Sequence, residues 1–459
     1  MGVDISDVTE ELLNFEKHTS LLNGLHAREW AHYRIKAYYR ILSDLNVIND
    51  VSLDYKSKGL LFKIKYMMKC VTKINFRYLL FNKKKYLIFS HPRSQGTRDI
   101  YSNELMEALG GSETVLNISH SEKLQFQGVR DSFTDLFRVS AKLSAIVLRV
   151  FFYRKSSEQL SCIDDLVKSK LFKSLDIDNY KKDYFLNIYE YKILYRIYKI
   201  FLKFNSFDEI FIVTAYYNLP LVHAAKDLGI KTTELQHGVI SRQHIAYNVK
   251  DSSCVPFCER VAFWGSYWSN VGRIPVGVEK IILGNGLVVA NSEPNEINRR
   301  TISNERKKVI VISQVSISTL MLDFVVSNMH DLADIDIYYK LHPGEYSSSK
   351  IVTDRLLNSF GERNIKVITN EYTLEELLDI CHIQIGAYST GIFQGLNKGL
   401  KTIVIPSPGI AYLDSLIEMN LIKICQNKND IISALSSNTV GSTERTNIFF
   451  KPFNNSMLS

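Results

Sequence analysis

The segment KKVIVIS, residues 307–313, begins a series of five short apolar runs in the last third of the chain. The others are IDIYYK (335–340), IKVIT (365–369), HIQIGA (382–387) and KTIVIP (401–406). Stretches of roughly ten residues with helical periodicity separate them. Apolar runs that alternate with helices in this way are typical of βαβ units and a parallel sheet. The series therefore predicts one Rossmann-like domain over residues 307–440.

A second series of the same kind precedes it. After YLIFS (86–90), apolar strand patterns return at EIFIVT (209–214), IKTTELQ (230–236), RVAFWG (260–265) and KIILGNG (280–286), with helical patterns between them. The polar stretch from Asn291 to Arg306 is the best candidate for a linker. We expect an α/β protein with two Rossmann-like domains, 81–292 and 307–440, facing a central cleft. Residues 1–80 read as a helical N-terminal extension.

Size and composition agree with a folded multidomain protein. The chain has 459 residues, of which 46% are hydrophobic and 23% charged. Only the polar residues after Asn438 are expected to form a disordered tail. The net charge of +8 indicates anionic partners. The acidic N-terminus lacks the features of a signal peptide, no run is long enough to span a membrane, and the six cysteines are scattered, so we expect a cytoplasmic protein.

The segment YYKLHPGE (338–345) is the first candidate for chemistry. It places Lys340, His342 and Pro343 at the carboxyl end of a strand, where ligands of parallel sheets bind. An imidazole there can donate a hydrogen bond to a phosphate. The alternative is a structural histidine that caps its own loop, and we favour phosphate contact.

A second candidate is GAYSTGIFQGL (386–396), at another junction of strand and helix. Ser389 can cap the helix, while Thr390 and Gly391 present backbone N–H groups at its positive end. This arrangement suits a phosphate, although capping alone explains a serine. Glu376, at the start of the preceding helix, is expected to approach the same nucleotide.

The first domain offers candidates for a catalytic base. In ELQHGVISRQH (234–244), His237 follows a strand and would enter the cleft from the side opposite His342. It can take a proton from an acceptor hydroxyl, or it can simply order its loop. Asp99 and Glu104, which follow the first strand, are competing bases.

Several familiar motifs are missing from the sequence. It contains no GxxxxGK[ST], no GxGxxG after a strand and no HExxH. Asp-x-Asp occurs at Asp334/Asp336, at the start of a strand, and at Asp176/Asp178, in a helical region. Neither place is where a nucleotide is expected, so we predict chemistry without a metal or cofactor, in which His342, Lys340 and the helix end neutralise the departing phosphate.

The segment YEYKILYRIYKIFLKF (189–204) predicts a basic amphipathic helix. Its cations can contact a membrane surface that carries a lipid-linked acceptor, or they can form the solvated face of a packed helix. Nucleic-acid binding is disfavoured because these basic aromatic stretches have helical periodicity and no recognised module surrounds them.

The motifs LQHG, KLHP and YSTG, in this order and at these strand ends, resemble those of bacterial surface-polysaccharide transferases of the GT-B type. Within that group they resemble sialyltransferases and Kdo transferases, and also CDP-glycerol glycerophosphotransferases. The resemblance implies that His342 and Pro343 match the His-Pro motif, that Ser389 and Thr390 hold the nucleotide phosphate, and that His237 matches the His-Gly position. It also implies that Asp99 is the acidic candidate for the base. The chain departs from the pattern in having Thr390 as the second hydroxyl residue and no evident acidic-acidic-Gly motif.

The resemblance implies transfer of a sialic-acid-like or Kdo-like sugar from a CMP donor to a lipopolysaccharide or capsule acceptor. It also implies peripheral contact with the cytoplasmic face of the inner membrane. A CDP-polyol phosphotransferase is the first alternative. A sugar-nucleotide epimerase and a non-catalytic assembly protein remain open as well.

Overall fold

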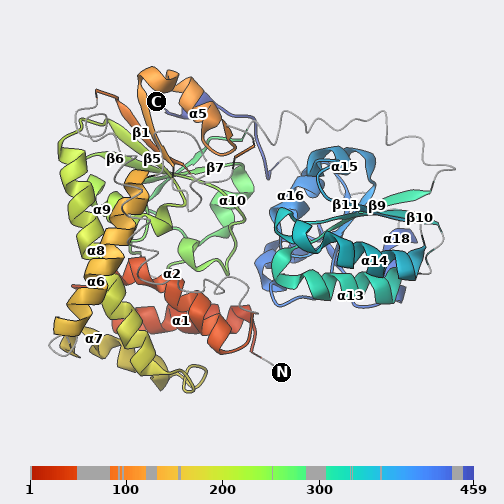
Figure 1. The fold of residues 1–459 in the computed structure, drawn as a ribbon, viewed down its shortest axis with the longest axis horizontal. Helices are drawn as coiled ribbons and strands as arrows, with labels where there is room; N and C mark the ends of the chain where they lie inside the picture. Colours follow the sequence, from red (N-terminus) through yellow and green to blue (C-terminus); the bar gives the residue numbers. More distant parts are fainter. Residues whose placement is uncertain are drawn as a thin grey trace.

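The computed structural model describes residues 3–48, 83–90, 94–95, 98–119, 132–152, 157–250, 252–285, 306–330, 332, 334–361, 364–436 and 448–458. Two six-stranded parallel sheets, each with helices packed against it, form two lobes (Figure 1). The predicted α/β fold with two Rossmann-like domains is therefore confirmed. The proposed linker lies outside the described residues except for Arg306.

The first sheet has the order β4-β1-β5-β6-β7-β8. Its central strand β5 is buried at every position, as expected for an apolar run covered by helices on both faces. The strand order reverses between β1 and β5, because β4 is added on one side of β1 and β5 and the later strands on the other. The strands are β1 (Tyr86–Ser90), β4 (Val115–Ser119), β5 (Glu209–Val213), β6 (Lys231–Leu235), β7 (Arg260–Phe263) and β8 (Glu279–Ile282). The helices are α5 (Asn103–Ala108), α6 (Ser132–Phe152), α7 (Ser157–Asp164), α8 (Ile177–Lys203), α9 (Leu219–Lys226) and α10 (Ser266–Val271).

The second sheet has the order β11-β10-β9-β12-β13-β14, which is 3-2-1-4-5-6 when its strands are counted along the chain. The order reverses between β9 and β12, and ligands of such sheets bind at that point. The strands are β9 (Lys307–Ile312), β10 (Ile335–Lys340), β11 (Ile365–Ile368), β12 (Ile383–Gly386), β13 (Lys401–Val404) and β14 (Lys423–Ile424). The helices are α13 (Ser318–Met329), α14 (Ser349–Phe360), α15 (Leu374–Ile380), α16 (Thr390–Asn397), α17 (Asp414–Glu418) and α18 (Lys428–Ser436).

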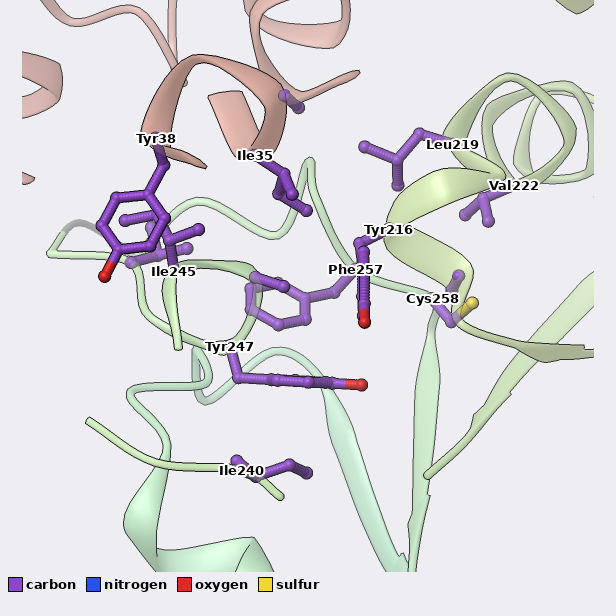
Figure 2. Close-up of a cluster of buried hydrophobic side chains, with 14 of the residues drawn as sticks. Ile35, Tyr38, Tyr216, Leu219, Val222, Ile240, Ile245, Tyr247, Phe257 and Cys258 are labelled. Carbon is purple, nitrogen blue, oxygen red and sulfur yellow. The ribbon is translucent and has the colours of Figure 1, made fainter. Parts of the chain in front are cut away.

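Two N-terminal helices, α1 (Ile5–Thr19) and α2 (Ala27–Asp44), share the hydrophobic core of the first domain. The buried guanidinium of Arg34 donates to both carboxylate oxygens of Glu16 and to the backbone carbonyls of Ile245 and Asn248. Further along α2, Ile35 and Tyr38 face the loop that carries Ile245 (Figure 2). The two helices therefore help to position loops at the carboxyl edge of the first sheet.

The C-terminal segment 448–458 crosses back to the first domain (Figure 1). Phe449 and Phe450 are buried, and the indole Nε1–H of Trp268 donates to the Phe449 carbonyl at 2.6 Å. The backbone N–H of Lys451 donates to the Trp264 carbonyl at 2.8 Å. The expectation of a disordered tail after Asn438 is therefore wrong for this segment, because its aromatic pair is anchored in the core.

The predicted basic helix corresponds to the second half of α8, which packs against α2, α6 and α9. Tyr191, Leu194 and Phe201 are buried in the core, so the apolar side of the helix is occupied by protein. On the other side, Lys192 lies 3.7 Å from Glu29. The described helices include none that is long and apolar enough to cross a membrane.

Candidate functional site

The loops that follow β9, β10 and β12 form the candidate nucleotide site. Strand β9 lies between β10 and β12, so the KLHPGE and YSTG motifs flank the loop after β9 on either side. The Ser313 hydroxyl of that loop donates to Glu345 Oε1 at 2.8 Å, and the Ser316 hydroxyl lies 3.1 Å from the Tyr388 hydroxyl. The loop after β9 thus joins the two predicted motifs at the point where the strand order reverses.

His342 is exposed and begins the short 3₁₀ helix η7 (Pro343–Ser348), with Pro343 at its first position. The imidazole Nδ1 of His342 accepts a hydrogen bond from the Gly344 N–H at 3.1 Å. The backbone N–H of His342 donates to Glu345 Oε2 at 2.9 Å. A neutral imidazole whose Nδ1 accepts must carry its proton on Nε2. The capping role that the sequence left as an alternative is therefore real, and it fixes the tautomer that can donate to a phosphate.

Lys340 and Glu376 are engaged by their own surroundings. The Lys340 ammonium donates to the carbonyls of Thr369 and Tyr372 in the loop after β11, and desolvation lowers its pKa. Glu376 Oε2 accepts from the N–H and the hydroxyl of Thr373 and completes a capping box at the start of α15. Both side chains stabilise the loop after β11, one strand further from the reversal point than His342.

Ser389 occupies the N-cap position of α16, but its hydroxyl makes no capping hydrogen bond. Thr390 and Gly391 form the first turn, where the backbone N–H groups have no partner within the helix. A Cβ at Gly391 would lie 3.2 Å from Leu374 and 3.3 Å from Ile312, so these neighbours would have to move by a few tenths of an ångström to admit a side chain. The YSTG motif thus gives α16 a close approach to β9 and leaves a serine hydroxyl uncommitted to the helix.

Three buried polar atoms around this point have no hydrogen-bond partner among the described residues. They are Gln314 Oε1 after β9, Ser389 Oγ after β12 and Ser407 Oγ after β13. Buried polar groups are normally paired, so these three atoms, in loops that follow neighbouring strands, are available to a polar ligand. Sequence reasoning did not find Gln314 or Ser407, because an isolated polar residue after a strand carries no pattern of its own.

In the first domain, His237 follows β6 and lies against an aromatic group. Its Nε2 is 3.2 Å from the hydroxyl of Tyr216, and the two rings are 5.8 Å apart. Tyr216 belongs to the 3₁₀ helix η4 (Ala215–Tyr217), which follows β5 at the reversal point of the first sheet. The preceding residue, Thr214, has φ +59°, which is unusual for a β-branched residue and marks a strained turn.

A buried carboxyl that the sequence did not single out lies behind His237. Glu234, 1% exposed on β6, accepts from the Tyr247 hydroxyl at 2.9 Å and from the Ala215 N–H at 3.1 Å. Burial raises its pKa to about 7. Because Ala215 begins η4, this carboxyl holds the turn that presents Tyr216 to His237.

The structure gives fewer contacts for the competing bases, Asp99 and Glu104. The backbone of Asp99 pairs with Ser94 in the two-stranded β2 (Ser94–Gln95) and β3 (Arg98–Asp99) hairpin, and its side chain lies outside the described residues. Glu104 lies in the first turn of α5. Of the Asp-x-Asp pairs, Asp336 is at the start of β10 and pairs with Arg306 at 2.8 Å, while Asp176 caps α8.

The two domains meet close to these loops. Arg242 pairs with Glu418 at 2.7 Å, and the Tyr267 hydroxyl contacts the Ser415 hydroxyl. The Tyr38 hydroxyl of α2 donates to the Gln243 carbonyl at 3.2 Å, and the Gln243 amide donates to Asp414 of the second domain at 3.4 Å. These contacts join the two domains near the carboxyl edges of their sheets, and α2 contributes to the same interface.

No family model matches the sequence, and no curated protein does either. Among solved structures the chain is similar to MurG from Acinetobacter baumannii, with 10% identity, 82% of this chain and 98% of that chain covered, and a TM-score of 0.46. It is similar to UDP-GlcNAc 2-epimerase from Methanocaldococcus jannaschii, with 12% identity, 81% and 98% covered, and a TM-score of 0.42. It is also similar to the glycosyltransferase of kitacinnamycin, with 10% identity, 80% and 93% covered, and a TM-score of 0.44.

Proposed function

We propose that this protein is a glycosyltransferase that moves a sialic-acid-like or Kdo-like sugar from a CMP donor to a lipopolysaccharide or capsule acceptor. The observation that supports it best is the set of unpaired buried atoms of Gln314, Ser389 and Ser407 around the reversal point of the second sheet. A nucleotide is a ligand that open parallel sheets take at this position. The choice of cytidine follows from the resemblance of the KLHP and YSTG motifs to those of CMP-dependent transferases.

The reaction needs a group that stabilises the departing phosphate. As the bond between sugar carbon and phosphate oxygen breaks, CMP leaves with the bonding pair and gains negative charge. The Nε2–H of His342, the Ser389 hydroxyl and the N-terminus of α16 are assigned to that charge. The role of His342 is compatible with its place in the loop, because Gly344 uses only Nδ1.

The acceptor hydroxyl attacks the same sugar carbon and loses its proton to a base. His237 is assigned this role, since it lies at the carboxyl edge of the first sheet and its Nε2 already meets a hydroxyl, that of Tyr216. The proposal includes a lipid-linked acceptor at the cytoplasmic face of the inner membrane, with the basic side of α8 as the candidate contact.

Thermal unfolding with CMP, CDP, UDP and CDP-glycerol tests the donor assignment. A ligand that binds only the folded state at a hundred times its Kd adds about 2.7 kcal/mol to the free energy of unfolding. CMP is expected to stabilise the wild type, and Ser389→Ala to reduce that effect. Ser359→Ala is the matched control, because Ser359 lies at the end of α14 and bonds only its own helix, at Arg355.

Stabilisation by UDP alone would contradict the cytidine assignment. Stabilisation by CDP-glycerol, with phosphorus appearing in the product, would favour the polyol phosphotransferase. An unchanged CMP response in Ser389→Ala would remove the site from the loop after β12.

A further inference from the structure

A cavity of about 640 Å³ lies between the turn that joins α1 to α2 and the helix α8. Leu25, Arg28 and Glu29 line it from the turn and from the first residues of α2. Tyr191 and Arg196 line it from α8. Sites for small ligands have volumes of about 300–1,000 Å³. The cavity is therefore large enough for a ligand of that class.

The cavity is separate from the candidate nucleotide site. Helix α2 begins at the cavity with Ala27, and further along it the Tyr38 hydroxyl donates to the carbonyl of Gln243, the residue that contacts Asp414 of the second domain. The residues from Ala27 to Tyr38 span about 16 Å along a helix axis. A ligand in the cavity would therefore be distant from the contacts between the two domains and from the loops of the proposed reaction.

The carboxylates beside the cavity are paired with cations of the protein itself. The Arg28 guanidinium donates to both carboxylate oxygens of Asp227 at 2.7 Å, and the Tyr195 hydroxyl donates to the same carboxylate at 2.6 Å. The Lys192 ammonium lies 3.7 Å from the Glu29 carboxylate. Each of these two carboxylates therefore has a positive partner already.

Arg196 is a cation of the cavity that has no such partner. It follows Lys192 by one turn of α8, and within the described part of the chain its guanidinium makes no hydrogen bond or ion pair. Lys199, whose ammonium lies 4.0 Å from Asp227, adds another positive charge. The pairs described above, Lys199 and Arg196 together comprise four cations and two carboxylates. This cluster therefore has a surplus of two positive charges.

Apolar surface borders these cations. Leu25 is 92% exposed although it lines the cavity, and Ile200, one turn of α8 after Arg196, is 56% exposed. The rings of Tyr191 and Tyr195 stack in the lining, with centroids 6.2 Å apart. Ligand sites combine apolar surface with a few polar groups that fix the orientation of the ligand. A ligand that joins an anionic group to an uncharged organic part matches this surface.

We propose that this cavity binds the phosphate group of a phosphate monoester, with Arg196 as its main contact. Such a group carries about two negative charges at pH 7, which match the surplus of the cluster, and a guanidinium can hold two of its oxygens at once. The organic part of the ligand would lie against Leu25 and Ile200. The inference goes beyond the proposed function, because the cavity needs neither the donor nor the catalytic loops. The headgroup of a lipid and a soluble phosphate ester share this chemistry.

Two probes that carry this group test the assignment on the full chain. Isothermal titration calorimetry measures the binding of glycerol 3-phosphate. Flotation measures the binding to vesicles of phosphatidylcholine with phosphatidic acid, whose headgroup is a phosphate monoester. The wild type is expected to bind at least one of the two probes. Arg196→Gln should weaken that binding by about 10-fold, because it removes a charge-assisted hydrogen bond to the phosphate, and Arg196→Lys should weaken it less.

Lys203→Gln is the matched control. Lys203 is exposed on the same helix and is not among the described residues that line the cavity, so this variant loses one positive charge elsewhere on α8 and should bind as the wild type does. Binding to the acidic vesicles alone would assign the cavity to a lipid headgroup, and binding to glycerol 3-phosphate alone would assign it to a soluble ester. The inference is overturned if neither probe binds, if Arg196→Gln and Lys203→Gln lose binding equally, or if vesicles of phosphatidylcholine alone bind equally well.

Discussion

His342 illustrates how one side chain can serve both a loop and a ligand. The sequence presented capping and phosphate contact as alternatives, whereas the structure assigns Nδ1 to the Gly344 N–H and so leaves the proton on Nε2. The two roles use different atoms of the ring. They can therefore be separated by substitution.

His342→Asn is expected to keep the loop and lose the donor. The asparagine amide reaches the position of Nδ1, so its oxygen can accept from Gly344, but nothing replaces Nε2. The melting temperature of His342→Asn should stay near that of the wild type, while its stabilisation by CMP falls. His342→Ala should have both a lower melting temperature and a weaker stabilisation by CMP. Thermal unfolding of the three proteins with and without CMP makes the comparison. A full CMP response in His342→Asn would show that the imidazole acts on the loop only.

Glu234 makes a prediction about pH. Its folded pKa of about 7 lies above the ordinary value of 4.5, so the folded state binds this proton more tightly than the unfolded state. Its contribution to stability is complete below pH 4.5 and is lost as pH rises through 7, by about 3 kcal/mol at most. Glu234→Gln keeps an acceptor for Tyr247 and Ala215 without a charge. The free energy of unfolding of the wild type minus that of Glu234→Gln, from urea unfolding, should therefore fall as pH rises from 5 to 8, and parallel curves would contradict the assignment.

Buried histidines have the opposite effect on how the free energy of unfolding depends on pH. Desolvation lowers the pKa of His32 and His223 to about 3 and that of His244 to about 4. The unfolded chain takes up protons below its ordinary pKa of 6.5 while these folded histidines stay neutral. Their contribution is complete above pH 6.5 and decreases as pH falls. The free energy of unfolding of the wild type should therefore drop between pH 6.5 and 4, and a flat urea profile over that range would contradict it.

At the scale of the elements, most of the second sheet could be predicted. Strands β9 to β13 fall within the predicted runs because their buried apolar residues contrast with polar turns. Strand β4, with the sequence VLNIS, was not predicted, since a polar residue interrupts its short apolar run. The motifs lie in the loops that follow β6, β10 and β12, as their positions after apolar runs predict. Their hydrogen bonds could not be predicted, because Lys340 meets carbonyls of residues that lie 29 and 32 positions away.

Helix α16 depends on glycines that bring it close to the sheet. A Cβ at Gly395 would lie 2.0 Å from Gln384 Oε1, whereas at Gly391 the nearest atom would be 3.2 Å away. Gly395→Ala must therefore displace Gln384, which donates to Ile392 and Thr402, and we expect a loss of about 1–3 kcal/mol. Gly391→Ala should cost less. Urea unfolding compares the two, and equal losses would show that the helix can shift freely.

At the scale of the whole molecule, the C-terminal segment connects the domains a second time. Phe449 is fully buried and packs against Tyr267 of the first domain and Phe393 of the second, with ring centroids 4.8 and 5.4 Å away. Phe449→Ala should lower the free energy of unfolding by about 3–5 kcal/mol. Met457→Ala, in the same segment but 37% exposed, should change it little. Equal denaturation midpoints for the two variants would mean that the segment is not part of the cooperative core.

Because the C-terminal segment 448–458 packs on the first domain, it also affects which fragments of the chain can be stable. Gly265 and Gly284 accommodate its backbone so closely that a Cβ would lie 2.3 Å from the Ile448 carbonyl oxygen at one and 2.1 Å from that of Pro452 at the other. A fragment ending at residue 285 would expose this groove together with the Trp268 indole that it satisfies. Such a fragment should recover its stability when a peptide of residues 448–458 is added in trans, or when that peptide is genetically joined after residue 285. The half that folds as a unit is thus encoded in two separate stretches of DNA.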